Sequence, residues 1–512
     1  GIISGNGSLI TSGTGTLTLS GASTYSGGTT VSTGTLKAGA SSTGSVTNGP
    51  FGTGTVTVSN GASLDVNGQT IANALSVQGA GVSSAGVVFN SVASEASLDG
   101  AVTLAGDTTI KSTSGGDLTF GGAVDGAYGL TVASDADVTF EVAVGANTTL
   151  SSVTVSAVNV NADAGLRTSN GDIDFTGVTG ATVLAGAIAT GGGDLIGAGT
   201  DFTNTGSITT GGGAVNLNSQ TGVINIDANI STGGGVFTVT GASSFDSGGR
   251  EISTAGLANV AGGAITITTS TGDLRPGVFY TQGGSVTSGV GMAGGSVTLV
   301  AGDVLHVSSL MQLWGSAGAG GSAGGAGGSI SLSGANGIVS NGASIYTYGG
   351  ASSSSGDTGG DVSFNSDTVL EFGLAVDTGT GSGDIRFAGT LAYSPTGNRT
   401  YDYTSLKAGT GNIDFDGAVG DGANAALGAV AVNSVATLDT DDVFKAASFT
   451  QSAGSVATQF DGAVTLTGNF DFTGQALTLN AALGSGGTVE VTNAGTFATA
   501  AGGDITSTGA FT

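Results

Sequence analysis

The sequence predicts an all-β protein folded as a right-handed parallel β-helix (β-solenoid). At roughly 25 residues per coil, the chain would form about twenty coils. Three observations predict this fold. Of the 512 residues, 100 are Gly and 3 are Pro, and charged residues make up 9% where ordinary globular proteins have about 25%. A short strand-like phrase recurs along the chain. Helical apolar stripes are missing, and each Gly would cost a helix about 1 kcal/mol.

The recurring phrase has the pattern of a strand with one buried face. In GDIDF, Ile173 and Phe175 flank a polar Asp174, and in GSVTL, Val297 and Leu299 flank a Thr. This two-residue period is typical of a half-buried strand. Ten of these phrases lie 20 to 33 residues apart and begin at Gly171, Gly193, Gly213, Gly235, Gly263, Gly295, Gly328, Gly360, Gly383 and Gly411.

A repeat of this length cannot close a core alone, but stacked copies bury one continuous apolar column. We therefore expect a single continuous β-helix over 1–512, as a fragment of a larger protein. The shortest steps predict minimal coils. The longer steps predict, over 263–360, longer coils with Gly/Ser-rich loops at a corner.

The N-terminal repeats are more specific. Residues 13–40 read GTGTLTLSGASTYSGGTTVSTGTLKAGA, in which Leu17, Tyr25, Val31 and Leu36 keep a recognisable spacing. This stretch resembles the autotransporter passenger-associated repeat, although Ser23 stands where that repeat usually has Asn, and coils of this type extend over 13–69. The later repeats resemble filamentous-haemagglutinin-like surface proteins. The resemblance implies a secreted β-helix at the bacterial cell surface, anchored to the outer membrane by segments outside this chain.

Composition excludes several classes of function. The 36 acidic residues against 9 Lys and Arg give a net charge of −27, which leaves no basic face for nucleic acid. The chain has no Cys and a single His, His306, for which we expect a structural or surface role. We expect no transmembrane helix, because the long uncharged stretch after His306 is too rich in Gly and Ser.

The best acidic cluster is LDTDD, with Asp439, Asp441 and Asp442 near Lys445. We interpret it as a solvated corner of a coil, while converging acids in a groove would suit a carbohydrate-active enzyme. The calcium-binding nonapeptide GGxGxDxUx is absent, so we expect no cofactor and no dedicated metal site, with isolated weak calcium sites left open. Dispersed acids such as Asp172 are interpreted as solubility groups.

The candidate binding residues lie in the longest repeats. The segments VFYTQGG, LMQLWGS and SIYTYGG start 32 and 34 residues apart and should stack on one another. Their aromatic residues, Tyr280, Trp314, Tyr346 and Tyr348, are expected to form an exposed row suited to sugars or a partner protein. The alternative is aromatic packing beneath the Gly/Ser loops.

These observations predict a non-enzymatic extracellular scaffold or adhesin that mediates attachment or aggregation. Its expected partners are cell-surface glycans or proteins, or copies of itself. Three alternatives stay open: a filament or sheath subunit that forms homo-oligomers by end-to-end stacking, a β-helical carbohydrate-active enzyme, and an ice-binding solenoid suggested by Thr-x-Thr pairs. The last residues restate the repeat phrase, so we expect further sequence or another subunit to follow them.

Overall fold

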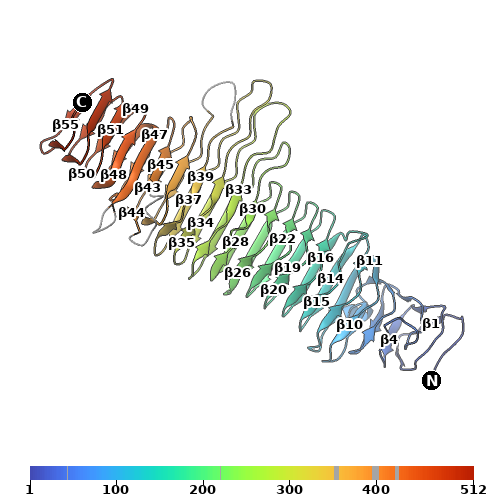
Figure 1. The fold of residues 1–512 in the computed structure, drawn as a ribbon. Coiled ribbons are helices and arrows are strands. Elements are labelled where there is room, and N and C mark those ends of the chain that lie inside the picture. Colours follow the sequence, from blue (N-terminus) through green and yellow to red (C-terminus); the bar gives the residue numbers. More distant parts are fainter. Residues whose placement is uncertain (43, 220, 351–356, 395–402, 421–425) are drawn as a thin grey trace. The chain divides into compact units, whose positions relative to one another are not determined.

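The structure, a computed structural model, divides into two compact units, Gly1–Ile230 and Ser231–Thr512. Each unit is all β and winds as a parallel β-helix (Figure 1), which confirms the predicted fold class. The described residues contain no α-helix, only a 3₁₀ turn at Val82–Ser84. A single continuous β-helix over 1–512 stays a prediction. The described residues are 1–42, 44–219, 221–350, 357–394, 403–420 and 426–512.

Over residues 173–209, each coil of the first unit consists of three short strands separated by corners. Each strand pairs in parallel with the equivalent strand of the next coil, as Ile173 with Leu195 and Ile188 with Ile208. Gly and polar residues occupy the corners, where the chain must change direction within a few residues. Two successive coils are β19 (Ile173–Val178), β20 (Thr182–Leu184) and β21 (Ile188–Ala189), then β22 (Leu195–Gly199), β23 (Phe202–Asn204) and β24 (Ile208–Thr209).

The second unit repeats this arrangement with longer corners after the third strand. Val297 pairs with Ile330, and Leu310 pairs with Ser344, so each coil lies directly on the one before it. The coils that concern the candidate site are β31 (Ile265–Thr269), β32 (Leu274–Arg275) and β33 (Val278–Tyr280); β34 (Val297–Ala301), β35 (Leu305–Val307) and β36 (Leu310–Gln312); β37 (Ile330–Gly334), β38 (Ile338–Ser340) and β39 (Ser344–Tyr346); β40 (Val362–Phe364), β41 (Thr368–Leu370) and β42 (Leu374–Asp377); β43 (Ile385–Phe387), β44 (Leu391–Tyr393) and β45 (Tyr403–Lys407).

The core of each unit is the column of inward side chains that the two-residue period predicts. Ile173, Phe175, Val297 and Leu299 are each at most 1% exposed, so the orientation inferred from the sequence is confirmed. Burying such a side chain contributes about 1.5 to 3 kcal/mol. Because every coil adds its own inward residues, the hydrophobic contribution accumulates coil by coil.

Phenylalanines at equivalent positions form stacks inside the second unit. The ring of Phe387 lies 4.6 Å from that of Phe364 and 5.1 Å from that of Phe415, and the planes are within 9° of parallel. The strand register places these residues one above another, at roughly the spacing of parallel strands. Phe residues at equivalent positions of successive coils therefore stack on one another along the core.

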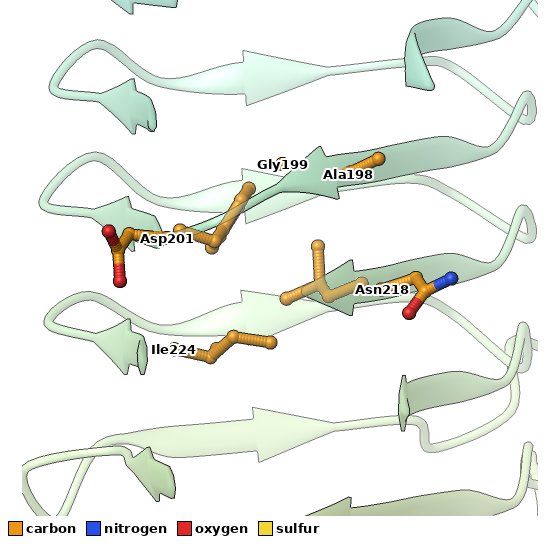
Figure 2. A pocket seen from close by; sticks show the side chains of 8 residues that line it. Ala198, Gly199, Asp201, Asn218 and Ile224 are labelled. Carbon is orange, nitrogen blue, oxygen red and sulfur yellow. The ribbon is translucent and has the colours of Figure 1, made fainter. Parts of the chain in front are cut away.

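Close packing also explains a glycine at an inward position of the first unit. A Cβ on Gly197 would lie 2.9 Å from the side chain of Leu217 and 3.3 Å from that of Phe202. The space between these residues holds no water-sized void. Figure 2 shows side chains that line this space, and inward and outward residues alternate along the strands here too: Ile224 is buried, and Asn218 lies on the outer side.

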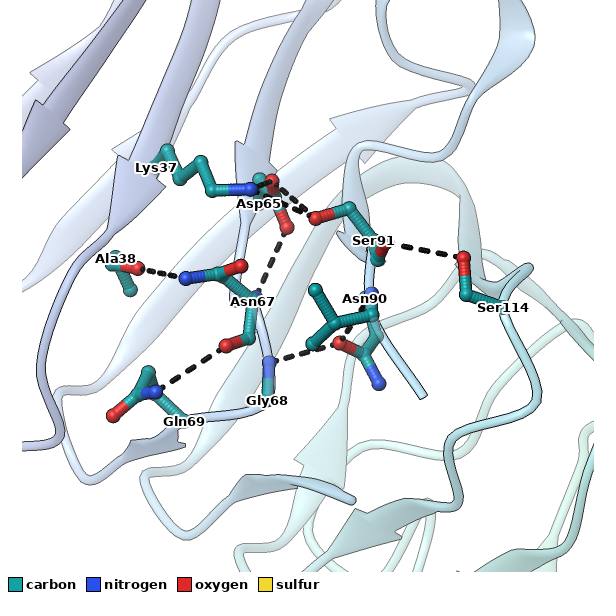
Figure 3. Close-up of polar contacts among 10 residues, drawn as sticks. Lys37, Ala38, Asp65, Asn67, Gly68, Gln69, Asn90, Ser91 and Ser114 are labelled. Carbon is teal, nitrogen blue, oxygen red and sulfur yellow. Dashed lines mark hydrogen bonds and ion pairs between the residues drawn. The ribbon is translucent and has the colours of Figure 1, made fainter. Parts of the chain in front are cut away.

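Polar side chains connect successive coils near the N-terminus (Figure 3). The Nζ atom of Lys37 lies 2.9 Å from Oδ2 of the buried Asp65, and the hydroxyl of Ser91 donates to the same carboxylate oxygen at 2.8 Å. The side-chain amide of Asn67 donates to the carbonyl of Ala38 at 2.9 Å. The buried carboxylate is therefore both paired and hydrogen-bonded, as a buried charge requires.

Within the described part of the chain, no helix is both long and apolar enough to cross a bilayer.

Candidate binding surface

A threonine–glycine pair closes the corner that follows the third strand of many coils. The Thr hydroxyl is buried and donates to the carbonyl of the Gly that opens the next phrase, and we call this pair the corner latch. The latch gives the buried Thr hydroxyl an acceptor and the Gly carbonyl a donor. Corner latches occur at Thr168–Gly171, Thr190–Gly193, Thr210–Gly213, Thr232–Gly235, Thr254–Gly263, Thr281–Gly295, Thr347–Gly360 and Thr378–Gly383.

The same latch closes corners of very different length. Gly193 lies three positions after Thr190, whereas Gly295 lies fourteen positions after Thr281. In the coil between those of Thr281 and Thr347, Leu313 stands at the Thr position and has no hydroxyl to donate. Its backbone carbonyl nevertheless accepts the N–H of Gly328 at 2.6 Å. The coil geometry at the base of a loop is therefore preserved whatever is inserted.

The long inserts stand away from β33, β36 and β39 as stacked loops (Figure 1), and we call the described parts of 281–296, 313–329 and 347–361 the glycine slab. The N–H of Gly291 donates to Ala323 O at 3.0 Å, and that of Gly294 donates to Ala326 O at 2.9 Å. Both bonds join one insert to the next at positions outside the strands of the coils. The slab is thus an ordered layer rather than an irregular loop.

Glycine is required where these layers approach one another. A Cβ on Gly325 would lie 2.0 Å from Met292 O, and one on Gly291 would lie 2.0 Å from Ser316 O. Ala326, next to Gly325, is exposed and points away from the contact. Small residues alternate in the slab because only its outer positions have room for a side chain.

Three of the four predicted aromatic residues meet where the slab joins the coils. The rings of Trp314 and Tyr348 stack at 4.9 Å with an interplanar angle of 30°, and Tyr346 contacts Tyr348 edge-on at 6.2 Å. All three side chains are half-buried. We call Trp314, Tyr346 and Tyr348 the aromatic patch; it combines ring faces for apolar contact with hydroxyls for hydrogen bonding.

The position of Tyr280 differs from the expectation that all four aromatic residues form a single row. The three segments stack in the predicted register, but Tyr280 pairs with Gln312, which in turn pairs with Tyr346. Tyr280 and Tyr346 therefore lie in one column, while Trp314 and Tyr348 lie in the next. The amide of Gln312 accepts a hydrogen bond from Gln282 at 3.0 Å, so a polar group separates Tyr280 from the patch.

Charged residues continue the surface beyond the aromatic patch. Asp377 pairs with Tyr346 in register and lies 3.3 Å from the Nζ atom of Lys407. Burial raises the pKa of Tyr348, and the negative charge of Asp377 raises it further, as does the neighbouring Tyr346. Its phenol therefore keeps its proton and stays a hydrogen-bond donor at neutral pH.

The acidic cluster forms at a corner but with a different membership. Carboxylate oxygens of Asp439, Asp441 and Asp461 lie within 4.8 Å of one another, the one such acidic group among the described residues with metal-ligand spacing. Asp442 instead accepts the backbone N–H of Val443 at 2.7 Å. Burial raises the pKa of Asp439, and the charges of Asp441 and Asp461 raise it further. The cluster could hold a cation, although burial and like-charge repulsion together account for the raised pKa of Asp439 without one.

His306 has a partner in the preceding coil. Its Nε2 atom lies 3.2 Å from Oδ2 of Asp273, which also accepts a hydrogen bond from Arg275 at 2.7 Å. Burial works against the charge of Asp273, but these bonds and charges, with the N–H of Val304, lower its pKa overall. This contact joins two coils, as a structural role requires.

Several dispersed acids have a role that the sequence did not reveal. A carboxylate oxygen of Asp172 accepts the backbone N–H of Asp194 in the next coil at 2.8 Å, and Asp361 accepts that of Asp384 at 2.9 Å. Such charge-assisted bonds stabilise the spacing between coils. The interpretation of these acids as solubility groups was therefore incomplete.

The sequence reasoning also missed Tyr403, which is 48% exposed. With Asn341, Gly342, Phe372 and Gly373, it lines a shallow depression at the start of β39 and β42. The signal in the sequence was a Gly at the same place in two successive coils, because missing side chains leave a notch in an otherwise continuous surface.

At the N-terminus, two stacked coils have the geometry expected of a repeat. Leu9 of β1 (Leu9–Thr11) pairs with Thr29 of β3 (Thr29–Val31), and β2 (Thr16–Leu19) pairs with β4 (Gly34–Ala38). The side chain of Tyr25 is buried, and its hydroxyl lies 2.6 Å from Oγ1 of Thr29. Residues 9–38 match the passenger-associated-transport-repeat family model.

The chain thus carries a passenger-associated-transport-repeat, which confirms the resemblance found in the sequence. The matched residues run from the start of β1 to the end of β4, so the repeat is a pair of stacked coils. The match covers residues 9–38, and a repeat of this kind suggests a passenger domain with a secreted or surface location. No curated protein and no solved structure matches the chain.

Proposed function

We propose that this chain is a non-enzymatic adhesive part of a secreted passenger domain, and that it attaches to cell-surface glycans through the aromatic patch. The observation that carries the proposal is the stacked Trp314–Tyr348 pair, half-exposed at the base of an ordered slab. Aromatic residues held rigidly at a surface are the side chains that most often dominate binding.

The surrounding structure supports this assignment. Tyr346 ends strand β39, while Trp314 and Tyr348 lie where the slab begins and are held by backbone hydrogen bonds, from Gly283 N–H to Trp314 O and from Gly315 N–H to Tyr348 O, each at 3.1 Å. Such support fixes the ring orientation before a ligand arrives, which lowers the entropy cost of binding. Insertion of loops at a latched corner is also a general route by which a rigid scaffold acquires binding function.

A glycan array probed with the purified chain and with two variants tests the proposal. We expect wild type to bind a subset of glycans, and Trp314→Ala to lower that binding by about 10-fold or more. Tyr128→Ala is the matched control, because Tyr128 is 42% exposed in the first unit, away from the patch residues in sequence. Equal loss in both variants, or no loss with Trp314→Ala, would contradict the assignment.

The non-enzymatic part of the proposal has its own test. Release of products from acidic polysaccharides, abolished by Asp441→Asn, would show that the acidic cluster is catalytic. Attachment through self-association is separated by light scattering of the purified chain: growth of large particles with concentration would favour a filament subunit over an adhesin.

A further inference from the structure

The depression beside Tyr403 has a simple origin in the strand register. Leu374 pairs with Thr404, so the preceding residues Gly373 and Tyr403 are neighbours on adjacent strands. Ser344 pairs with Ala375, which in the same way sets Gly342 beside Gly373. Two successive glycines therefore leave a gap about two strand spacings wide, or roughly 10 Å, next to the tyrosine.

The walls of this notch combine aromatic and polar chemistry. Tyr403 is 48% exposed and Phe372 is half-buried, and both line the depression together with the exposed Asn341. A site that pairs ring faces with an amide suits a ligand with an apolar face and hydroxyls at its edge. A pyranose ring has this combination of properties.

The notch and the aromatic patch lie at opposite ends of the same strands. Gly342 and Tyr346 are four positions apart, which at strand spacing corresponds to about 13 Å. The outward residues between them are small: Ser344, Ala375 and Ser405. We call this surface, from the Tyr403 notch to the aromatic patch, the track.

We propose that the track binds one linear, neutral glycan chain, with one sugar ring in the Tyr403 notch and another on the Trp314–Tyr348 pair. This inference rests on the proposed function and specifies its ligand. The net charge of −27 disfavours acidic glycans, and the nearby Lys407 is already paired with Asp377. A protein partner would need an apolar core across the interface, whereas the middle of the track carries only small side chains with little apolar area.

The test measures binding of linear oligosaccharides of one to six residues, in neutral, carboxylated and sulfated series, by glycan array and then calorimetry. We expect neutral chains of four or more residues to bind best. Tyr403→Ala should lower the affinity for these long chains by about 10-fold and leave chains of one or two residues unchanged. Tyr403→Phe keeps the ring and should bind as wild type, and thermal unfolding checks that each variant is folded.

The outcomes separate the two proposals. If Trp314→Ala abolishes binding and Tyr403→Ala changes it for no chain length, the track is wrong and the proposed function stands. If charged glycans bind better than neutral ones, the ligand class is wrong. If neither variant alters binding, or no glycan binds, both proposals are wrong, and a protein partner at the aromatic patch becomes the better explanation.

Discussion

The short corners of the first unit and the long corners of the second share one closing contact and differ in everything between its ends. Thr190 bonds to Gly193, three positions later, and Thr281 bonds to Gly295, fourteen positions later; in both corners the hydroxyl donates to the Gly carbonyl. The coil is therefore specified by its strands and latch. The coil does not constrain the residues of the insert, so these can form a surface of their own. The aromatic patch lies where such inserts begin.

The largest expected effect is on stability, and it comes from the core of the coils and not from the inserts. Phe387→Ala removes the middle ring of a three-ring stack and should lower the free energy of unfolding by about 3 to 5 kcal/mol. Chemical denaturation of the purified chain measures it. A loss below about 1 kcal/mol would show that the ring stack does not carry the stability of this region.

The glycine slab should respond to a single methyl group. Gly325→Ala would place a Cβ 2.0 Å from Met292 O, so we expect the slab to open locally at a cost of about 1 to 3 kcal/mol. Hydrogen exchange should show faster exchange at Gly291 and Gly294, with the coil strands unchanged. Ala326→Val is the matched control, because its side chain is exposed; equal effects of the two changes would contradict the packing.

The latch itself should contribute equally in both kinds of corner. Thr190→Val and Thr281→Val each leave a Gly carbonyl without its buried donor, and each should cost about 1 to 2 kcal/mol. Denaturant unfolding compares the two. A much larger cost for Thr281→Val would mean that a long insert depends on its latch more than a short corner does.

The smallest expected effect is electrostatic, and it concerns Asp439 of the acidic cluster, which belongs to no corner latch. Because the pKa of Asp439 is raised in the folded state, the folded chain binds this proton more tightly than the unfolded chain does. Stability associated with Asp439 therefore falls as pH rises through its folded pKa. Asp439→Asn should stabilise the chain at pH 7 by less than about 1 kcal/mol and weaken this pH dependence.

The measurement for Asp439→Asn is the difference in melting temperature between wild type and variant across acidic to neutral pH. Added salt should reduce the difference, since it screens the repulsion from Asp441 and Asp461. A variant that is less stable than wild type at neutral pH would show that the carboxylate makes a stabilising contact instead.

Much of the coil was predictable because its signals are local. The alternation around Asp174 indicates which side chains turn inward, and the Gly at each phrase start indicates where the chain turns. The aromatic segments could likewise be aligned by their spacing. The Thr of the latch was present in the sequence as well, but its partner lies up to fourteen residues away, so no local pattern identified it.

The sequence by itself thus determined the all-β class, the inward column that contains Ile173 and Phe175, and the passenger repeat over 9–38. Only the tertiary structure decided which outward residues meet: it separated Tyr280 from the patch and set Tyr403 beside two glycines. The physical reason is that inward orientation follows from a two-residue period within one strand. Outward neighbours depend on the register between coils, which loops of unequal length conceal.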